Sequence, residues 1–185
     1  SDVCSSDLDK NAGANKAVTV TGIVLADGSG LASNYSFAQP AGLSASILPK
    51  ALSVSGITAA DKVYDGTTAA AVNAANAVFD GLVGNDRVTV SASGTFADAN
   101  AGAGKTVALH NTYGGADVAN YLIAGQAGTT ATITPKALTI TGLGVAAKTY
   151  DGSTTATLTG GTLSGLVGGE TMGLNGLTGA FADKN

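Results

Sequence analysis

The chain has 185 residues, of which 44% are hydrophobic and only 5% aromatic, with 27 glycines and no tryptophan. Its formal net charge of −4 is spread along the chain without a basic stripe, which argues against nucleic acid as a partner. A single cysteine, Cys4, excludes a disulfide framework, and no apolar run is long enough to span a membrane.

The first residues, 1–8, do not follow the pattern of the rest of the chain. They match the translation of a common sequencing-adaptor oligonucleotide, so we interpret residues 1–8 as a non-native segment and exclude them from the fold. An ordinary chain terminus is the alternative. On either interpretation Cys4 is not expected to be a catalytic thiol.

The sequence consists of repeating modules, of which residues 51–136 are one complete copy. Residues 9–50 are expected to be the C-terminal half of the copy before it. Lys16–Thr21 alternates apolar and polar residues, which predicts a half-buried strand. Ala26–Gly30 is expected to be a loop. Tyr35–Phe37 and Ser44–Leu48 are predicted to be further strands, and Pro49 ends this half-module.

Residues 51–136 are expected to form one complete module. Alternation at Leu52–Ser55 and Arg87–Ser91 predicts strands, and Lys62–Tyr64 runs into the turn signal Asp65-Gly66. The remaining predicted strands are Thr67–Val72, Thr106–Leu109, Tyr121–Ile123 and Thr130–Thr134. Several short strands separated by turns, without a convincing amphipathic helix, indicate an all-β module.

Residues 137–185 are expected to be the N-terminal half of a third module. Ala51–Gly56 recurs as Ala137–Gly142, and Tyr64–Gly66 recurs as Tyr150–Gly152, so both phrases return after 86 residues. A fixed period of this length identifies a tandem array.

Local sequence signals predict three hairpin turns in this array. Gly160-Gly161 lies between two short apolar-containing runs, which is typical of a hairpin, and Asn73–Asn76 is expected to be a longer version of the same turn. Gly102–Thr106 is also expected to be a hairpin turn.

The recurring phrases resemble a known family. Lys62–Thr68, Gly94–Gly102, Asn120-Tyr121 and Ala131–Lys136 look like the YDG repeat of large bacterial surface and secreted proteins of the filamentous-haemagglutinin type. The resemblance extends over nearly everything after Asp9. It implies a repetitive exoprotein stalk, often exported by two-partner secretion, located outside the cell or on its surface. It implies no catalytic residues.

The candidate site is a structural motif present in both copies that cover it. In the first copy Gly66 permits a positive φ, Asp65 can accept hydrogen bonds from nearby backbone N–H groups, and the Tyr64 ring covers a thin core. A ligand contact through Asp65 and Tyr64 is the alternative. The six residues of the motif are Tyr64, Asp65, Gly66, Tyr150, Asp151 and Gly152.

Other chemistry has weaker support, and no cofactor or metal is expected. Calcium needs several oxygen ligands, but Asp61, four residues before Asp65, becomes Ala147 in the next copy. Gly102–Thr106 lacks the first glycine of a phosphate-binding loop. His110, the only histidine, has no partner for a catalytic triad or a zinc site.

We therefore expect tandem antiparallel β-sandwich-like modules, with β-grasp-like modules carrying one short helix as the alternative. Pro135-Lys136-Ala137 joins two modules without a flexible linker, and this favours a stiff rod. The expected function is a structural stalk segment of a bacterial adhesin and not an enzyme, with neighbouring repeats as partners. In the alternative, each repeat binds a host glycan or matrix protein, and Tyr113 is the best exposed aromatic for that role.

Overall fold

The computed structural model describes residues 9–183, so the interpretation of residues 1–8 concerns a segment outside the described range. Strands account for 45% of the structure and helix for about 3%. The described helices are two three-residue 3-10 turns, η2 (Ala32–Asn34) and η3 (Val118–Asn120). The prediction of an all-β fold is confirmed, and neither turn supplies the helix of the β-grasp alternative. None of the described helices is long and apolar enough to cross a membrane.

The chain divides into two compact units, and the boundary runs through the middle module. Of the described residues, the first unit contains 9–58 together with Val72–Ser93 and Leu109–Ala127. The second contains Ala59–Ala71, Gly94–Ala108 and residues 128–183. We call residues 51–97 the front half of this complete module and residues 98–136 its back half. By the sequence repeat, residues 9–50 are then a separate back half and residues 137–185 a separate front half.

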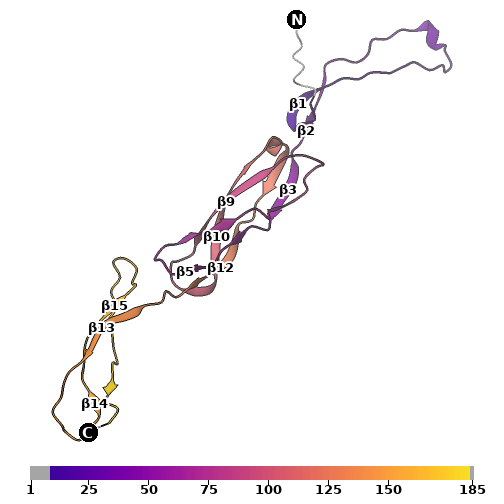
Figure 1. Ribbon diagram of the computed structural model, residues 1–185. Helices are drawn as coiled ribbons and strands as arrows, with labels where there is room; N and C mark the ends of the chain where they lie inside the picture. The colour runs from indigo at the N-terminus through magenta and orange to yellow at the C-terminus, as the bar shows by residue number, and fades with distance from the viewer. Residues whose placement is uncertain (1–8, 184–185) are drawn as a thin grey trace. The chain divides into compact units, whose positions relative to one another are not determined.

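The first unit holds two small sheets. β1 (Gly13–Val18) and β2 (Leu43–Ile47) pair antiparallel at the base of a long loop (Figure 1). In the other sheet, β3 (Lys50–Ser55) lies between β11 (Tyr121–Ala124) and β8 (Val78–Asp80). β3 is parallel to β11 and antiparallel to β8.

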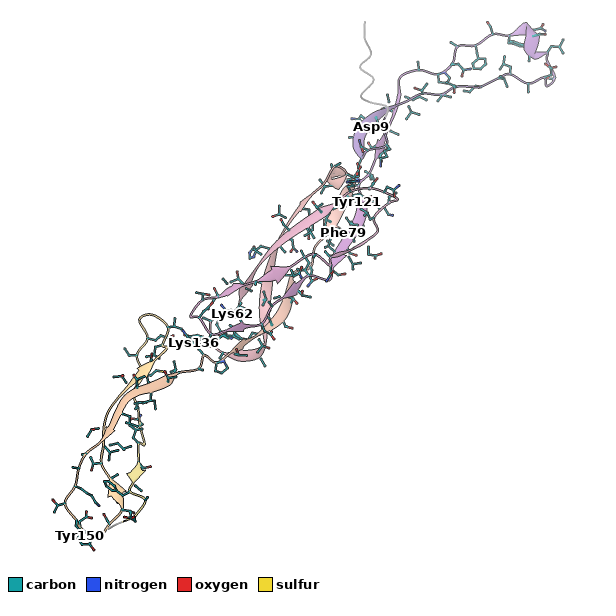
Figure 2. The ribbon with its side chains drawn as sticks, in the orientation of Figure 1. Asp9, Lys62, Phe79, Tyr121, Lys136 and Tyr150 are labelled. Carbon is teal, nitrogen blue, oxygen red and sulfur yellow. The ribbon has the colours of Figure 1, made fainter. Side chains whose placement is uncertain are left out.

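The core of the first unit joins the two halves of the complete module. Leu52 and Val88 of the front half are buried with Tyr121 of the back half, and Phe79 packs against them (Figure 2). Alternate residues of β3, Leu52 and Val54, face inward, which is the period of two that a strand imposes.

The largest sheet has five strands in the order β5-β12-β10-β9-β6. β12 pairs antiparallel with β10 and parallel with β5. The bounds of its strands are β5 Lys62–Val63, β6 Ala69–Ala70, β9 Thr89–Phe96, β10 Gly102–Gly114 and β12 Gly128–Thr134. The two other strands of the complete module are β4 Thr58–Ala59 and β7 Val72–Asn73.

The third copy, within the second unit, forms two antiparallel ladders. β13 (Thr139–Val145) pairs with β15 (Leu158–Ser164), and β14 (Thr155–Ala156) pairs with β16 (Gly179–Ala180). The last pairing repeats that of β6 with β9, because Ala69 and Ala70 face Thr95 and Gly94 there.

Most of the strand pairings are antiparallel, as expected for these modules, but not all of them are. Two pairings, β3 with β11 and β5 with β12, are parallel. Each of them joins a front-half strand to a back-half strand far along the chain. Parallel neighbours require a long crossover connection, and local turn signals cannot reveal it.

Two of the predicted hairpin turns lie inside strands instead. Gly102–Thr106 belongs to β10, where the register shifts between Gly102 and Lys105 as in a bulge. The pair Gly160-Gly161 lies in β15, and a Cβ on Gly160 would stand 2.5 Å from the Gly142 carbonyl oxygen. Glycine here permits close strand approach and not a turn.

Other local predictions have mixed outcomes. A turn does form at Asn73–Asn76, where the Ala77 N–H donates to the Ala74 oxygen at 3.0 Å. It is not the predicted hairpin turn, because β7 pairs with β4 and β8 pairs with β3. The strand predicted at Lys16–Thr21 is shifted, because β1 ends at Val18. Tyr35–Phe37 is not a strand.

Burial separates the complete module from the two half-modules. Every buried hydrophobic side chain of the described residues except Ala156 lies between residues 51 and 136. Most of the large exposed hydrophobic side chains lie in residues 9–50 and 137–183. The closed core of the described residues is therefore concentrated in residues 51–136.

Candidate functional site

The Tyr64-Asp65-Gly66 motif forms a tight corner directly after β5. One oxygen of the Asp65 carboxylate accepts from the Thr67 N–H at 2.8 Å and from the Thr67 hydroxyl at 2.9 Å. Gly66 has a φ of 77°, in the left-handed region that favours glycine. The aspartate thus bonds to the backbone of its own turn, as its preference for such positions predicts.

Lys62, the first residue of β5, donates hydrogen bonds to the residues of this corner. Its ammonium donates to Asp65 at 2.8 Å, to the Thr67 carbonyl at 2.8 Å and to the Ala69 carbonyl at 3.0 Å. It also lies 5.5 Å from the centre of the buried Phe96 ring, within range of a cation–π interaction. One lysine therefore connects the turn, the following strand β6 and the core.

The same corner is built again 86 residues later. Asp151 accepts from the Ser153 N–H at 2.9 Å and from Lys148 at 2.8 Å, and Gly152 has a φ of 73°. The Lys148 ammonium lies 5.8 Å from the centre of the Phe181 ring. Ser153 occupies the position of Thr67 in this second corner, and the hydrogen bonds to the aspartate and the lysine are retained. A hydroxyl at this position is therefore sufficient for the corner to form.

The lysine determines the charge state of the corner. Its hydrogen bond, followed by those from Thr67, lowers the pKa of Asp65 to about 2. The corresponding bonds from Lys148 and Ser153 lower the pKa of Asp151 to about 2 as well. Both carboxylates are ionised at neutral pH and already hold several donors, which leaves them poor candidates for a general acid or base.

The two tyrosines of the motif have different surroundings. The Tyr64 N–H donates to the Thr134 carbonyl at 2.8 Å, and its hydroxyl donates to the Glu170 carboxylate. That hydrogen bond is the main reason why the pKa of Tyr64 is raised. Tyr150 is largely exposed. The expected cover over a thin core is only partly seen, since Tyr64 is half-buried.

A second polar corner also occurs twice. Asp98 accepts from the Asn100 N–H at 2.8 Å and from Lys105 at 2.6 Å. Asp9 accepts in the same way from the Asn11 N–H and from Lys16. Gly102 and Gly104 lie within β10, so this segment lacks the loop before a helix that a phosphate-binding motif uses.

An acidic side chain recurs at corresponding positions of two module copies, Asp86 in one and Glu170 in the next. Asp86 accepts from Lys10 at 2.5 Å and from the Tyr121 hydroxyl at 2.7 Å, and both bonds lower its pKa. Glu170 occupies the corresponding position in the third copy and accepts from Tyr64. In each case the acid bonds to a residue of the preceding module, Lys10 or Tyr64, across the short proline-containing connection.

Two cavities lie beside these acids, and they are lined by residues at corresponding positions of the sequence repeat. One, of about 280 Å³, includes Ala12, Lys50 and Val83. The other, of about 320 Å³, includes Ala101, Lys136 and Val167, which are their counterparts in the sequence repeat. The recurrence indicates one kind of module junction present twice.

The remaining candidates do not assemble into a reactive site. No group of three His, Cys, Asp or Glu side chains within residues 9–183 could hold a metal ion. Asp61 accepts from the Thr132 N–H at 2.6 Å and so joins the two halves of the module. His110 is exposed on β10. Tyr113 is half-buried, which makes it a poor sugar-stacking surface.

Sequence reasoning missed the two residue types that organise the site. Lys62 and Lys148 precede their aspartates by three residues, and Asp86 and Glu170 follow the Gly-Leu-Val-Gly phrase in both copies. Their recurrence was the available signal, although their bonding partners are far apart along the chain.

The fold and the doubled corners define a class: a tandem all-β repeat protein whose recurrent polar residues bond to one another and to the backbone. The YDG domain profile matches residues 48–131 and 134–185, which is most of the chain. The chain therefore belongs to the YDG domain family. No curated protein and no solved structure matches it significantly.

Proposed function

We propose that this chain is a repetitive structural segment of a secreted or surface-exposed bacterial adhesin, which holds a distal binding region away from the cell. The observation that best supports this proposal is that the same hydrogen-bonded Lys-Asp-Gly corner occurs twice in the chain. Its charged groups are used to shape a turn, with Lys62 and Asp65 bonded to each other and to the same hydroxyl residue. Residues committed in this way support a scaffold better than they support catalysis.

The module connections support the same proposal. A spacer needs joints that resist bending, and a proline between two strands removes much of the local freedom. The hydrogen bonds of Asp86 and Glu170 to the preceding module add a side-chain contact at each joint. Extracellular location and bacterial origin are part of this proposal and follow from the resemblance to exoprotein repeats.

Small-angle scattering on chains with one, two and three complete modules tests the proposal. The expected result is a radius of gyration that increases linearly with module number. A radius that levels off would contradict a spacer function.

A glycan array probed with residues 51–136 tests the alternative function. Robust and saturable glycan binding would replace the spacer function with a binding function. The half-buried Tyr113 gives the alternative less support than exposed aromatic residues would.

A further inference from the structure

The corner formed by Tyr64, Asp65 and Gly66 has two different sets of neighbours. Asp65 accepts hydrogen bonds from Lys62 and from the backbone of its own turn. Tyr64 and Gly66 instead contact side chains of the following module copy, residues 137–183. One residue of the motif thus shapes the turn, and the other two face the next copy.

Gly66 makes the apolar part of this contact. A Cβ atom on Gly66 would stand 2.9 Å from Cγ1 of Val167, which is closer than two carbon atoms pack. The glycine therefore has a second role besides permitting its φ of 77°, because it leaves room for a side chain of the next copy. Val167 is half-buried and belongs to the Gly-Leu-Val-Gly phrase that occurs at residues 81–84 and 165–168.

Tyr64 makes the polar part of the contact, because its hydroxyl donates to the Glu170 carboxylate. Glu170 lies three residues after Val167, and its N–H donates to the Val167 carbonyl at 3.1 Å. The same turn is present in the preceding copy, where the Asp86 N–H donates to the Val83 carbonyl at 3.0 Å. One recurrent turn therefore presents an apolar side chain and a carboxylate together.

The second corner shows that these contacts are not needed for the turn itself. Gly152 has a φ of 73°, but a Cβ atom there would meet nothing within 4 Å, and Tyr150 is 71% exposed. Asp151 nevertheless accepts the same hydrogen bonds from its lysine and from its own turn as the first corner's aspartate does. The contacts of Tyr64 and Gly66 are therefore additional to the hydrogen bonds that form the corner.

We propose that Tyr64 and Gly66 form a docking surface for the following repeat, which seats the turn from Val167 to Glu170 on the corner and restricts motion at the joint. Contacts between neighbouring repeats are a main source of order in a tandem array. The inference rests on the spacer function proposed above and deepens it, by naming the side chains that stiffen a joint. It also assigns a separate role to each residue of the motif.

The test measures a distance across this joint in the whole chain. Spin labels are attached at Thr130→Cys and Thr157→Cys, two exposed positions of the second unit, in a chain that also carries Cys4→Ser. Pulsed dipolar electron paramagnetic resonance gives the distribution of distances between the two labels. A docked joint is expected to give a narrow distribution, and an undocked joint a broad one.

Two variants remove the contact in different ways, and the second corner supplies a matched control for each. Tyr64→Phe removes the hydroxyl without backbone strain, and Gly66→Ala places a methyl group where Val167 packs. Both should raise the undocked population several-fold and broaden the distribution. Tyr150→Phe and Gly152→Ala make the same changes where no contact exists, so they should leave the distribution unchanged.

A double-variant cycle identifies the polar partner. Glu170→Ala should broaden the distribution as Tyr64→Phe does, and the two changes together should broaden it no further than either alone. Additive broadening, or equal broadening by the control variants, would overturn the docking proposal. A narrow distribution that every variant leaves unchanged would overturn it while the spacer function stands, because the proline connection would then hold the joint by itself. A broad distribution in the chain without these variants would contradict both.

Discussion

Truncating Ile133 and its repeat counterpart Ile47 compares one side chain in a complete and in an incomplete module. Ile133 is 1% exposed and Ile47 is 44% exposed. Ile133→Ala removes three buried carbon atoms, worth roughly 0.8 kcal/mol each, and leaves a cavity that raises the cost further. We expect the free energy of unfolding to fall by about 3–4 kcal/mol.

The same truncation at Ile47 removes half-exposed atoms and leaves no closed cavity, so we expect a loss of about 1 kcal/mol or less. Urea unfolding followed by tyrosine fluorescence measures both changes, at a protein concentration where the chain is monomeric. With a slope of about 1–1.5 kcal/mol per molar urea, Ile133→Ala should lower the midpoint by roughly 2–4 M. Equal shifts for the two variants would refute the claim that only the complete module has a closed core.

Three further predictions concern the corner. Asp65 has a pKa of about 2 when folded, below its ordinary value of 3.8, so its stabilisation is full above about pH 4 and is lost as pH falls toward 2. The melting-temperature gap between the unmodified chain and Asp65→Asn should shrink over that range, and a constant gap would contradict it. Gly66→Ala should lower the free energy of unfolding by about 1–2 kcal/mol, because Gly66 has a positive φ. Gly28 has open space around it and no positive φ, so Gly28→Ala should leave the free energy of unfolding unchanged in the same assay. Lys62→Met should lower the melting temperature, whereas Lys136→Met should leave it nearly unchanged, since Lys136 is exposed; similar losses would contradict the role given to Lys62.

Alternation of apolar and polar residues predicts those strands that have one buried face and one exposed face. Leu52 and Val54 alternate with serines, and the strand there is present because that alternation places one face inward. The 86-residue period predicts that both motif copies form the same turn, and the structure builds both with the same hydrogen bonds.

Non-local pairing explains what the pattern could not predict. Each of the two parallel pairs joins a strand of the front half to a strand of the back half, far along the chain. No short sequence motif predicts a pairing over that distance. Tyr35 and Tyr121 both follow an asparagine and precede an alanine by three residues, yet only Tyr121 is buried in a strand, where β11 pairs with β3. Gly160-Gly161 has turn-like composition but serves a close approach of two strands.

Hydrogen–deuterium exchange on the whole chain at low concentration tests the central claim most directly, namely that a front half and a back half together make one stable structural unit. Backbone amides between residues 51 and 136 should be protected as one cooperative unit. Amides of residues 19–42, which form no strand, should exchange at nearly unprotected rates. Uniform protection along the chain, or rapid exchange within β3, β10 and β12, would contradict the claim.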